Sequence, residues 1–316
     1  MGEFQLIEWI RQQLDEDDPD LSLGIGDDAA VLNLPADREL VITTDTLNSE
    51  VHFNSETSPP DLGYKALAVS LSDLAAMGAR PKWVLLSVSM PAEDRLWFEA
   101  FVGGFLELAS NIGVTLIGGD TCSGVLSVTV TALGLVRPGQ ALTRTGARAG
   151  DLVVVSGHLG DAALALFEQQ GGETRDEICF QALHRPVPRI ALGLSLVGKA
   201  TSCIDISDGL WADLGHIAQQ SGCGAIIEVA RLPAGSALYE QQESKRWQLQ
   251  LTGGEDYELC FTIPPQQKSS LQELSTELEI ELTVIGKIVA GRGVQCVRPD
   301  GQLVELEHRG YKHFEH

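Results

Sequence analysis

Four short acidic clusters flanked by glycine are the residues of this chain that could do chemistry. They are Gly-Ile-Gly-Asp-Asp at 24–28, Gly-Gly-Asp at 118–120, Asp-Ile-Ser-Asp-Gly at 205–209 and Gly-Gly-Glu-Asp at 253–256. Each lies at or just beyond an apolar run, so we expect the carboxylates at the ends of strands, where they could converge. Mg²⁺ prefers oxygen ligands and normally shares them with substrate phosphates. The clusters therefore point to phosphate chemistry.

Each cluster also has a simpler interpretation as a turn or a helix cap. Glycine and aspartate are common turn residues, and Ser207 or Asp208 could cap a helix. Asp205 is harder to explain in this way, because it lies in an apolar strand and an unpaired buried carboxylate is costly. Asp73 falls on one face of a predicted helix, where metal binding and a salt bridge to Lys65 both remain open. Like charges about 5 Å apart repel by roughly 1 to 3 kcal/mol, so convergence of all four clusters would require bound cations.

Two further side chains and the absence of certain motifs narrow the chemistry. His52 lies in a polar loop and is a candidate for substrate binding, although a solvent-exposed histidine is the simpler interpretation. Arg144 lies in a Gly-rich stretch and its planar guanidinium suits a nucleotide phosphate, although it could be an ordinary surface arginine. No Gly-Lys-Ser/Thr sequence follows the first Gly-x-Gly, and the motif set of protein kinases is absent. The chain is therefore neither a P-loop kinase nor a protein kinase.

The composition indicates a soluble, globular protein of two domains. The chain has 316 residues, of which 44% are hydrophobic and 21% charged, and its formal net charge is −22. This charge disfavours nucleic acids and anionic membranes as partners. The six cysteines are scattered without Cys-x-x-Cys spacing, the start does not read as a signal peptide, and no apolar run approaches about 18 residues. We therefore expect a cytoplasmic protein.

Strands and helices that must position the clusters are mixed in both halves, which indicates an α/β or α+β protein. In the first half, the patterns predict strands at 29–34, 40–44, 83–90, 114–117, 126–131 and 134–136, and helices at 3–14, 58–78 and 91–112. The polar stretch 137–150 is the predicted domain junction. In the second half, we predict strands at 151–156, 202–206, 225–229, 257–263 and 282–289, and helices at 162–170, 186–197, 210–220 and 266–278. A strand followed by Gly-Gly and an acid is predicted once in each half.

The ordered set of motifs resembles the thiamine-monophosphate kinases over nearly the whole chain. The resemblance rests on the segments 2–4, 24–30, 43–47, 52–53, 64–79, 116–121, 141–144, 204–210, 253–259 and 310–314. Single motifs are shared with a wider superfamily that includes aminoimidazole ribonucleotide synthetase, selenophosphate synthetase and a hydrogenase maturation factor. The resemblance implies a two-domain aminoimidazole ribonucleotide synthetase-like fold with mixed sheets and flanking helices. Residues 1–137 would bind Mg-ATP and dimerise through their sheet, and residues 138–316 would complete the active-site cleft.

The same resemblance implies transfer of the ATP γ-phosphoryl group to thiamine monophosphate, which gives thiamine diphosphate. Carried over by position, the implied Mg²⁺ set is Asp27, Asp28, Thr43, Thr44, Asp45, Asp73, Asp120, Asp205 and Asp208. The implied ATP contacts are Gly119, Asp120, Arg144 and Ser207, and the implied thiamine contacts are His52, Glu255 and Tyr311. The segments around 171–180 and 233–248 match the family poorly, so no role is assigned to them.

The acceptor is already a phosphate monoester, so we expect no covalent intermediate and no obligate general base. Positioning and charge neutralisation would then carry the catalysis. Three alternatives remain. They are another superfamily member that activates an amide or selenide, a Mg-nucleotide sensor that has lost turnover, and a protein that stores divalent metal. The first is disfavoured because no cysteine precedes Cys122 and the chain ends in Phe-Glu-His.

Overall fold

The structure is a computed structural model, and it describes residues 8–14, 18–171 and 176–306. The chain divides into two compact units. The N-terminal unit comprises the residues up to Leu74 together with Ala79–Gly139, and the C-terminal unit comprises Ala75–Gly78 and the residues from Gln140 onward. In the part of the chain that the structure describes, no helix is long and apolar enough to cross a bilayer.

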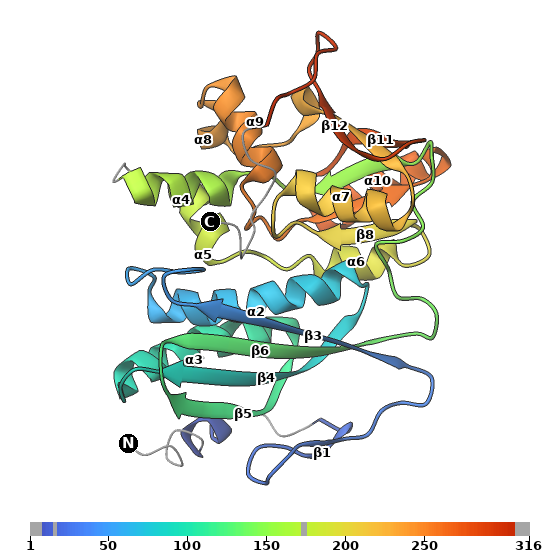
Figure 1. Cartoon of the computed structure of the whole chain (residues 1–316). Helices are drawn as coiled ribbons and strands as arrows, with labels where there is room; N and C mark the ends of the chain where they lie inside the picture. Colours follow the sequence, from blue (N-terminus) through green and yellow to red (C-terminus); the bar gives the residue numbers. More distant parts are fainter. Residues whose placement is uncertain (1–7, 15–17, 172–175, 307–316) are drawn as a thin grey trace. The chain divides into compact units, whose positions relative to one another are not determined.

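The N-terminal unit is built on a four-stranded sheet in the order β3-β6-β4-β5, coloured blue to green in Figure 1. Its strands are β3 (Glu39–Asn48), β4 (Arg80–Met90), β5 (Thr115–Ser123) and β6 (Ser127–Val136). Strand β6 pairs antiparallel with β3 and β4, whereas β4 and β5 are parallel and are connected through helix α3 (Arg95–Ile112). A short pair, β1 (Leu21–Leu23) and β2 (Val31–Leu32), carries the first acidic cluster in its connecting loop.

Helix α2 (Pro59–Ala76) packs closely on both α3 and the sheet. A Cβ at Gly63 would overlap the backbone of α3, and a Cβ at Gly104 would overlap the backbone of α2, so only glycine permits this approach. Ser70 of α2 donates a hydrogen bond of 2.9 Å to Asp45 of β3. The helix that carries Asp73 is therefore fixed against the strand that carries Asp45.

The C-terminal unit is built on a six-stranded sheet in the order β12-β9-β11-β7-β10-β8. Its strands are β7 (Leu152–Ser156), β8 (Ser202–Asp205), β9 (Gly224–Glu228), β10 (Leu259–Ile263), β11 (Leu282–Val289) and β12 (Gly293–Val297). Strands β9 and β12 are parallel, and the other neighbouring strands are antiparallel. The sheet is therefore mixed, as the resemblance implied.

Seven α-helices connect the described strands of the C-terminal unit. They are α4 (Asp161–Gly171), α5 (Glu177–His184), α6 (Ile190–Leu196), α7 (Leu210–Gln220), α8 (Ser236–Tyr239), α9 (Glu243–Thr252) and α10 (Lys268–Leu278), with short 3₁₀ turns at Val229–Arg231 and Pro265–Gln267. Leu210, Leu214 and Ile217 of α7 belong to the same buried core as the inner strands. This helix directly follows the third acidic cluster, so its packing determines where that cluster lies.

Most predicted elements are confirmed, and several predicted boundaries are wrong. The strand predicted to end at 117 continues through Gly118-Gly119-Asp120 as β5, so these residues lie within a strand rather than beyond its end. The strands predicted at 126–131 and 134–136 are one strand, β6. Residues 249–251 are the last turn of α9, so the fourth cluster follows a helix. The prediction that a strand precedes the second Gly-Gly-acid segment was therefore wrong.

The elements that were not predicted include β1, α5, α8, most of α9 and β12. The helix predicted at 186–197 begins only at Ile190, because Pro186 and Pro188 precede it. Of the helix predicted at 3–14, residues 8–11 are helical and residues 1–7 lie outside the described residues.

Candidate active site

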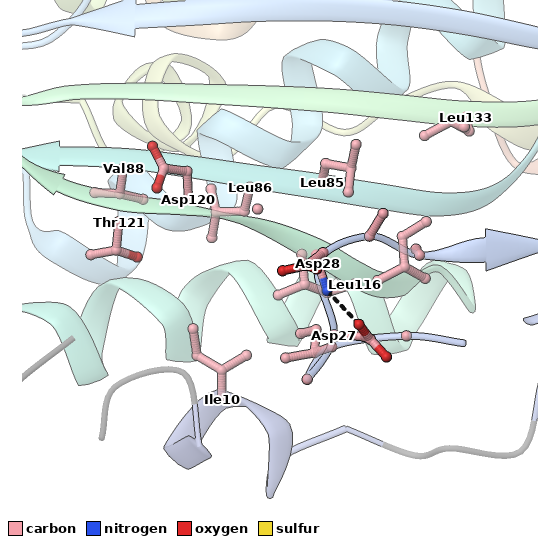
Figure 2. A pocket seen from close by; sticks show the side chains of 18 of the residues that line it. Ile10, Asp27, Asp28, Leu85, Leu86, Val88, Leu116, Asp120, Thr121 and Leu133 are labelled. Carbon is pink, nitrogen blue, oxygen red and sulfur yellow. Dashed lines mark hydrogen bonds between the residues drawn. The ribbon is translucent and has the colours of Figure 1, made fainter. Parts of the chain in front are cut away.

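A cleft of about 830 Å³ in the N-terminal unit is lined by two of the four acidic clusters (Figure 2). The loop with Asp27 and Asp28 and the β5 segment with Asp120 both contribute to its lining. Much of the remaining lining is apolar, from side chains such as Leu85, Leu116 and Leu133. For these two clusters, the structure gives the convergence that the sequence led us to expect.

Glycine is required at both clusters for a specific reason. Gly26 has a φ of +125°, a conformation that side chains with a Cβ rarely adopt. A Cβ on Gly119 would overlap the carbonyl oxygen of Leu86 on the neighbouring strand. Asp27 Oδ1 accepts a hydrogen bond of 2.9 Å from the backbone N–H of Asp28, which restrains the backbone at these two residues. The backbone itself therefore holds Asp28 and Asp120 at the cleft.

A second group of acids lies between β3 and α2. Thr43 Oγ1 donates a hydrogen bond to Asp73 Oδ2, and Ser70 Oγ donates to Asp45 Oδ2 at 2.9 Å. Burial, and secondly the charge of Asp73, raise the pKa of Asp45 to about 6, although the hydrogen bond from Ser70 acts in the opposite direction. A carboxylate in such surroundings becomes fully charged only at some cost, which a bound cation would offset.

Thr44 and His52 each have a hydrogen-bond partner outside this acid pair. The hydroxyl of Thr44 bonds to the carbonyl oxygen of Val130 at 3.2 Å and lies 3.1 Å from Thr131 Oγ1. Successive side chains of a strand point to opposite faces, so the side chain of Thr44 faces away from Asp45. The backbone N–H of Asn48 donates to His52 Nδ1 at 3.1 Å. The ring of His52 is therefore oriented by its own loop.

In the C-terminal unit, the third and fourth clusters are docked on each other. The N–H of Glu255 donates to the carbonyl oxygen of Ser207 at 2.9 Å, and the N–H of Tyr257 donates to that of Ile206 at 2.8 Å. Glu255 and Tyr257 have φ values of +64° and +50°, which are unfavourable for residues other than glycine. Such strain persists where the surrounding structure enforces it, and it is frequent at functional sites. Ser207, Asp208 and Glu255 are thus held in one loop pair.

Two carboxylates hold this loop pair, namely Asp213, which the sequence did not single out, and Asp256 of the fourth cluster, to which no separate role was assigned. Asp213 Oδ2 accepts hydrogen bonds of 3.1 Å from the N–H groups of Ser207 and Asp208. Asp256 Oδ1 accepts one of 2.8 Å from Gly160. Burial, and secondly the charges of Asp205 and Asp208, raise the pKa of Asp213 to about 8, and burial raises that of Asp256 well above its usual value.

A buried ion pair lies at Glu258, two residues after the fourth cluster. Arg189 Nε donates a hydrogen bond of 2.7 Å to Glu258 Oε2, and its Nη2 bonds to Oε1 of the same carboxylate. Ser156 Oγ is a further donor to Glu258 Oε2. Burial lowers the pKa of Arg189, but Glu258 outweighs this effect and the pKa is raised. A single Arg near the start of a helix gives no sequence signal of such a role, so Arg189 could be found only in the structure.

The remaining predicted site residues stand as follows. Arg144 is exposed, and its carbonyl oxygen accepts a hydrogen bond of 3.2 Å from Ser221. Asp205 is the last residue of β8 and is buried. Tyr311 lies outside the described residues. Within each unit, the site residues are close neighbours in the pairs described above.

The donor set fits Mg²⁺. Within residues 8–14, 18–171 and 176–306, no three His, Cys, Asp or Glu side chains form a group that could hold a metal ion alone. Mg²⁺ is usually held by one or two carboxylates together with substrate phosphates and water, so pairs of acids suffice. The predicted ligands offer only oxygen, and the raised pKa of Asp45 shows a carboxylate that a cation would stabilise.

Comparison with known proteins identifies the family. Residues 26–136 match the family model of the AIR synthase related protein, N-terminal domain, and residues 148–298 match that of its C-terminal domain. The thiamine-monophosphate kinase of Haemophilus influenzae is 44% identical, over 99% of this chain and 98% of its own. This chain belongs to the thiamine-monophosphate kinase family. The predicted family and the predicted two-domain α/β fold are thus confirmed.

Solved structures of relatives agree with this assignment. The crystal structure of thiamine-monophosphate kinase from Stenotrophomonas maltophilia is 48% identical, covers 96% of this chain and 98% of its own, and has a TM-score of 0.88. A second structure, AaThiL complexed with AMPPCP and TMP, is 32% identical over 99% of this chain and 97% of its own, with a TM-score of 0.78. A member of the family has therefore been seen with an ATP analogue and TMP bound together.

Proposed function

We propose that this chain transfers the γ-phosphoryl group of ATP to thiamine monophosphate and forms thiamine diphosphate and ADP. The observation that carries the proposal is membership of the thiamine-monophosphate kinase family over nearly the full length of the chain. The complex of AaThiL with AMPPCP and TMP supports ATP and thiamine monophosphate as the two reactants. The acid pairs on the cleft and between β3 and α2 supply the chemistry expected for phosphate substrates.

In this proposal the acids of both units hold the polyphosphate and its cations. Asp27, Asp28, Asp120 and the pair Asp45 and Asp73 act from the N-terminal unit, with Thr43 donating to Asp73. Asp205 and Asp208 act from the C-terminal unit. Mg²⁺ would neutralise the phosphate charges that otherwise keep the two anionic reactants apart. ATP is further contacted by Gly119, Arg144 and Ser207.

The chain has to position its reactants rather than activate them. The phosphate monoester of the acceptor is already an oxygen nucleophile near neutral pH, so no side chain has to remove a proton. His52, Glu255 and Tyr311 bind the acceptor, and the carboxylate of Glu255 is matched to the positive charge of thiamine. In-line transfer then depends on orientation, which typically supplies a large part of the rate in phosphoryl transfer.

We further propose that the chain acts as a cytoplasmic homodimer that pairs through the N-terminal sheet. The face of β3 opposite Asp45 carries Thr44, Thr46 and Ile42, and the side chain of Ile42 is 59% exposed although it lies within a ten-residue strand. Thr46 meets Thr129 of β6 at 2.9 Å, which gives a regular ladder of hydroxyl groups beside it. A second copy would cover this face. Light scattering of the purified protein tests the proposal, and a mass of about 34.0 kDa would contradict it.

The decisive experiment incubates the pure protein with ATP, Mg²⁺ and thiamine monophosphate and separates the products. We expect thiamine diphosphate and ADP in equal amounts. Asp120→Asn and Asp208→Asn should abolish turnover with the fold intact, whereas Asp37→Asn, at an exposed position, should be as active as the wild type. Free thiamine as the preferred acceptor would indicate a pyrophosphokinase instead. Near-normal activity of Asp120→Asn would refute the role of this residue.

A further inference from the structure

The turn that carries Ser207 and Asp208 is attached to the helix that follows it by a single carboxylate oxygen. Asp213 Oδ2 accepts hydrogen bonds of 3.1 Å from the N–H of Ser207 and from the N–H of Asp208. The side chain of Asp213 belongs to the first turn of α7 and is 3% exposed. It therefore reaches back over the start of its own helix and holds the two residues before the N-cap.

The sequence at the start of α7 leaves this task to Asp213. The N-cap is Gly209, which has no side chain to accept a hydrogen bond, and its φ is +112°. A Cβ at this position would lie 2.9 Å from backbone atoms of Thr252, so a capping Ser or Asp cannot replace the glycine. The usual N-cap acceptor is therefore excluded here by the close approach of α9. An acceptor within the helix takes over part of its role.

The position of this turn also determines the position of the fourth cluster. The carbonyl oxygen of Ser207 accepts from Glu255, and a Cβ on Gly254 would lie 2.5 Å from that same oxygen. A displacement of Ser207 would therefore displace Glu255 as well. Both clusters of the C-terminal unit depend on the same two hydrogen bonds.

We propose that Asp213 is a positioning residue of the kinase, which fixes Ser207 and Asp208 through its two backbone hydrogen bonds and takes no direct part in binding cation or phosphate. This inference rests on the proposed function for its effect on turnover, but its structural part can be measured without substrate. Since one oxygen accepts both bonds, the amide oxygen of asparagine can replace it. The acceptor atom is thus essential and the negative charge is not.

Three variants at this position separate an acceptor from a charge. Asp213→Asn keeps the oxygen in place and cannot ionise, Asp213→Glu keeps an ionisable carboxyl group and moves the oxygen by one methylene group, and Asp213→Leu loses both. Ile217→Val is the matched control. Ile217 is fully buried on the same helix, and its aliphatic side chain cannot form a hydrogen bond with the turn. It reports what a small loss of packing in α7 does by itself.

The first measurement is hydrogen exchange of the peptide 204–210 in metal-free protein. We expect Asp213→Asn and Ile217→Val to exchange like the wild type. The amides of Ser207 and Asp208 should exchange about tenfold faster in Asp213→Glu and Asp213→Leu, the equivalent of one net hydrogen bond. If Asp213→Leu does not fold, Asp213→Glu still decides the question. Unchanged exchange in Asp213→Glu would overturn the proposal.

The second measurement is turnover as a function of Mg²⁺ concentration. Misplacement of reacting groups by about 1 Å typically costs about 100-fold in rate, so we expect a loss of this order in Asp213→Glu together with a higher Mg²⁺ requirement. Asp213→Asn and Ile217→Val should keep the wild-type Mg²⁺ dependence. Loss of turnover in Asp213→Asn with normal exchange would show that the charge matters and would overturn the proposal. A wild-type protein that makes no thiamine diphosphate would refute the proposed function and leave the exchange result standing.

Discussion

Substitution of Asp45 by asparagine should stabilise the metal-free protein while abolishing its activity. Asp45 is partly buried between β3 and α2. It lies close enough to Asp73 for the charge of Asp73 to disfavour the ionisation of Asp45. Asparagine has the same shape, and its amide oxygen can still accept the hydrogen bond that Ser70 donates. The change therefore removes a charge and little else.

The expected gain in stability of Asp45→Asn follows from the pKa of Asp45. Burial and Asp73 raise the pKa of Asp45 from 3.8 to about 6. Between these two values the folded protein binds more protons than the unfolded chain, so the stability of the wild type falls as the pH rises. The fall is complete above the folded pKa, and a shift of about two units corresponds to about 3 kcal/mol. Asp45→Asn does not titrate, so it should match the wild type near pH 4 and exceed it in stability by up to about 3 kcal/mol near pH 7.5.

Urea unfolding in EDTA at the two pH values measures this difference. Asp37→Asn is the control, since the side chain of Asp37 is 76% exposed and its removal should change the free energy of unfolding by less than about 0.5 kcal/mol. Mg²⁺ should stabilise the wild type and narrow the gap. An Asp45→Asn protein that is no more stable than the wild type near pH 7.5, or equally improved at both pH values, would contradict the argument.

Three further predictions concern packing, the buried ion pair and their controls. Gly104→Ala should destabilise the protein by about 1–3 kcal/mol in thermal unfolding, because the added Cβ would overlap the backbone of α2. Gly103 has open space around it, so the control Gly103→Ala should instead stabilise α3 by up to about 1 kcal/mol. Equal midpoints for the two variants would show that α2 and α3 are not in backbone contact. Arg189→Met should lower the free energy of unfolding by about 3–5 kcal/mol, since Glu258 is left charged and buried. The control Arg95→Met removes an exposed ion pair and should lower the free energy of unfolding by less than about 1 kcal/mol in the same assay. Loss of turnover from Arg189→Met should follow the displacement of the fourth cluster, and full activity would argue against a supporting role.

The elements that could be predicted are those whose signals are local. Helix α2 begins at Pro59 and ends just before Gly78, which has a φ of +62°. The preference for proline in the first turn of a helix and for glycine after its last turn does not depend on the rest of the chain. These two signals can therefore be recognised in the sequence alone. The acid clusters were found for the same reason, because their spacing along the chain is itself the signal.

The elements that could not be predicted depend on distant partners. Strand β5 continues through two glycines because β4 lies beside it, with Leu86 paired to Gly119 and Ser87 to Asp120. Propensity alone ends a strand at two glycines. Helix α9 has a polar sequence, and its buried residues Trp247 and Leu251 find their partners elsewhere in the C-terminal unit. Tertiary packing decided both cases.

The two Gly-Gly-acid segments show what a shared motif does and does not imply. One lies inside a strand and the other follows a helix, so they are not equivalent elements of two related halves. They share a requirement of the backbone, since a Cβ on Gly119 would overlap the carbonyl oxygen of Leu86, and a Cβ on Gly254 would lie 2.5 Å from that of Ser207. In both, the second glycine lets the chain pass close to a neighbouring carbonyl group, and the acid that follows is set beside that neighbour. The glycines of the clusters therefore place the carboxylates, and in the C-terminal unit Asp213 and Asp256 keep that placement fixed.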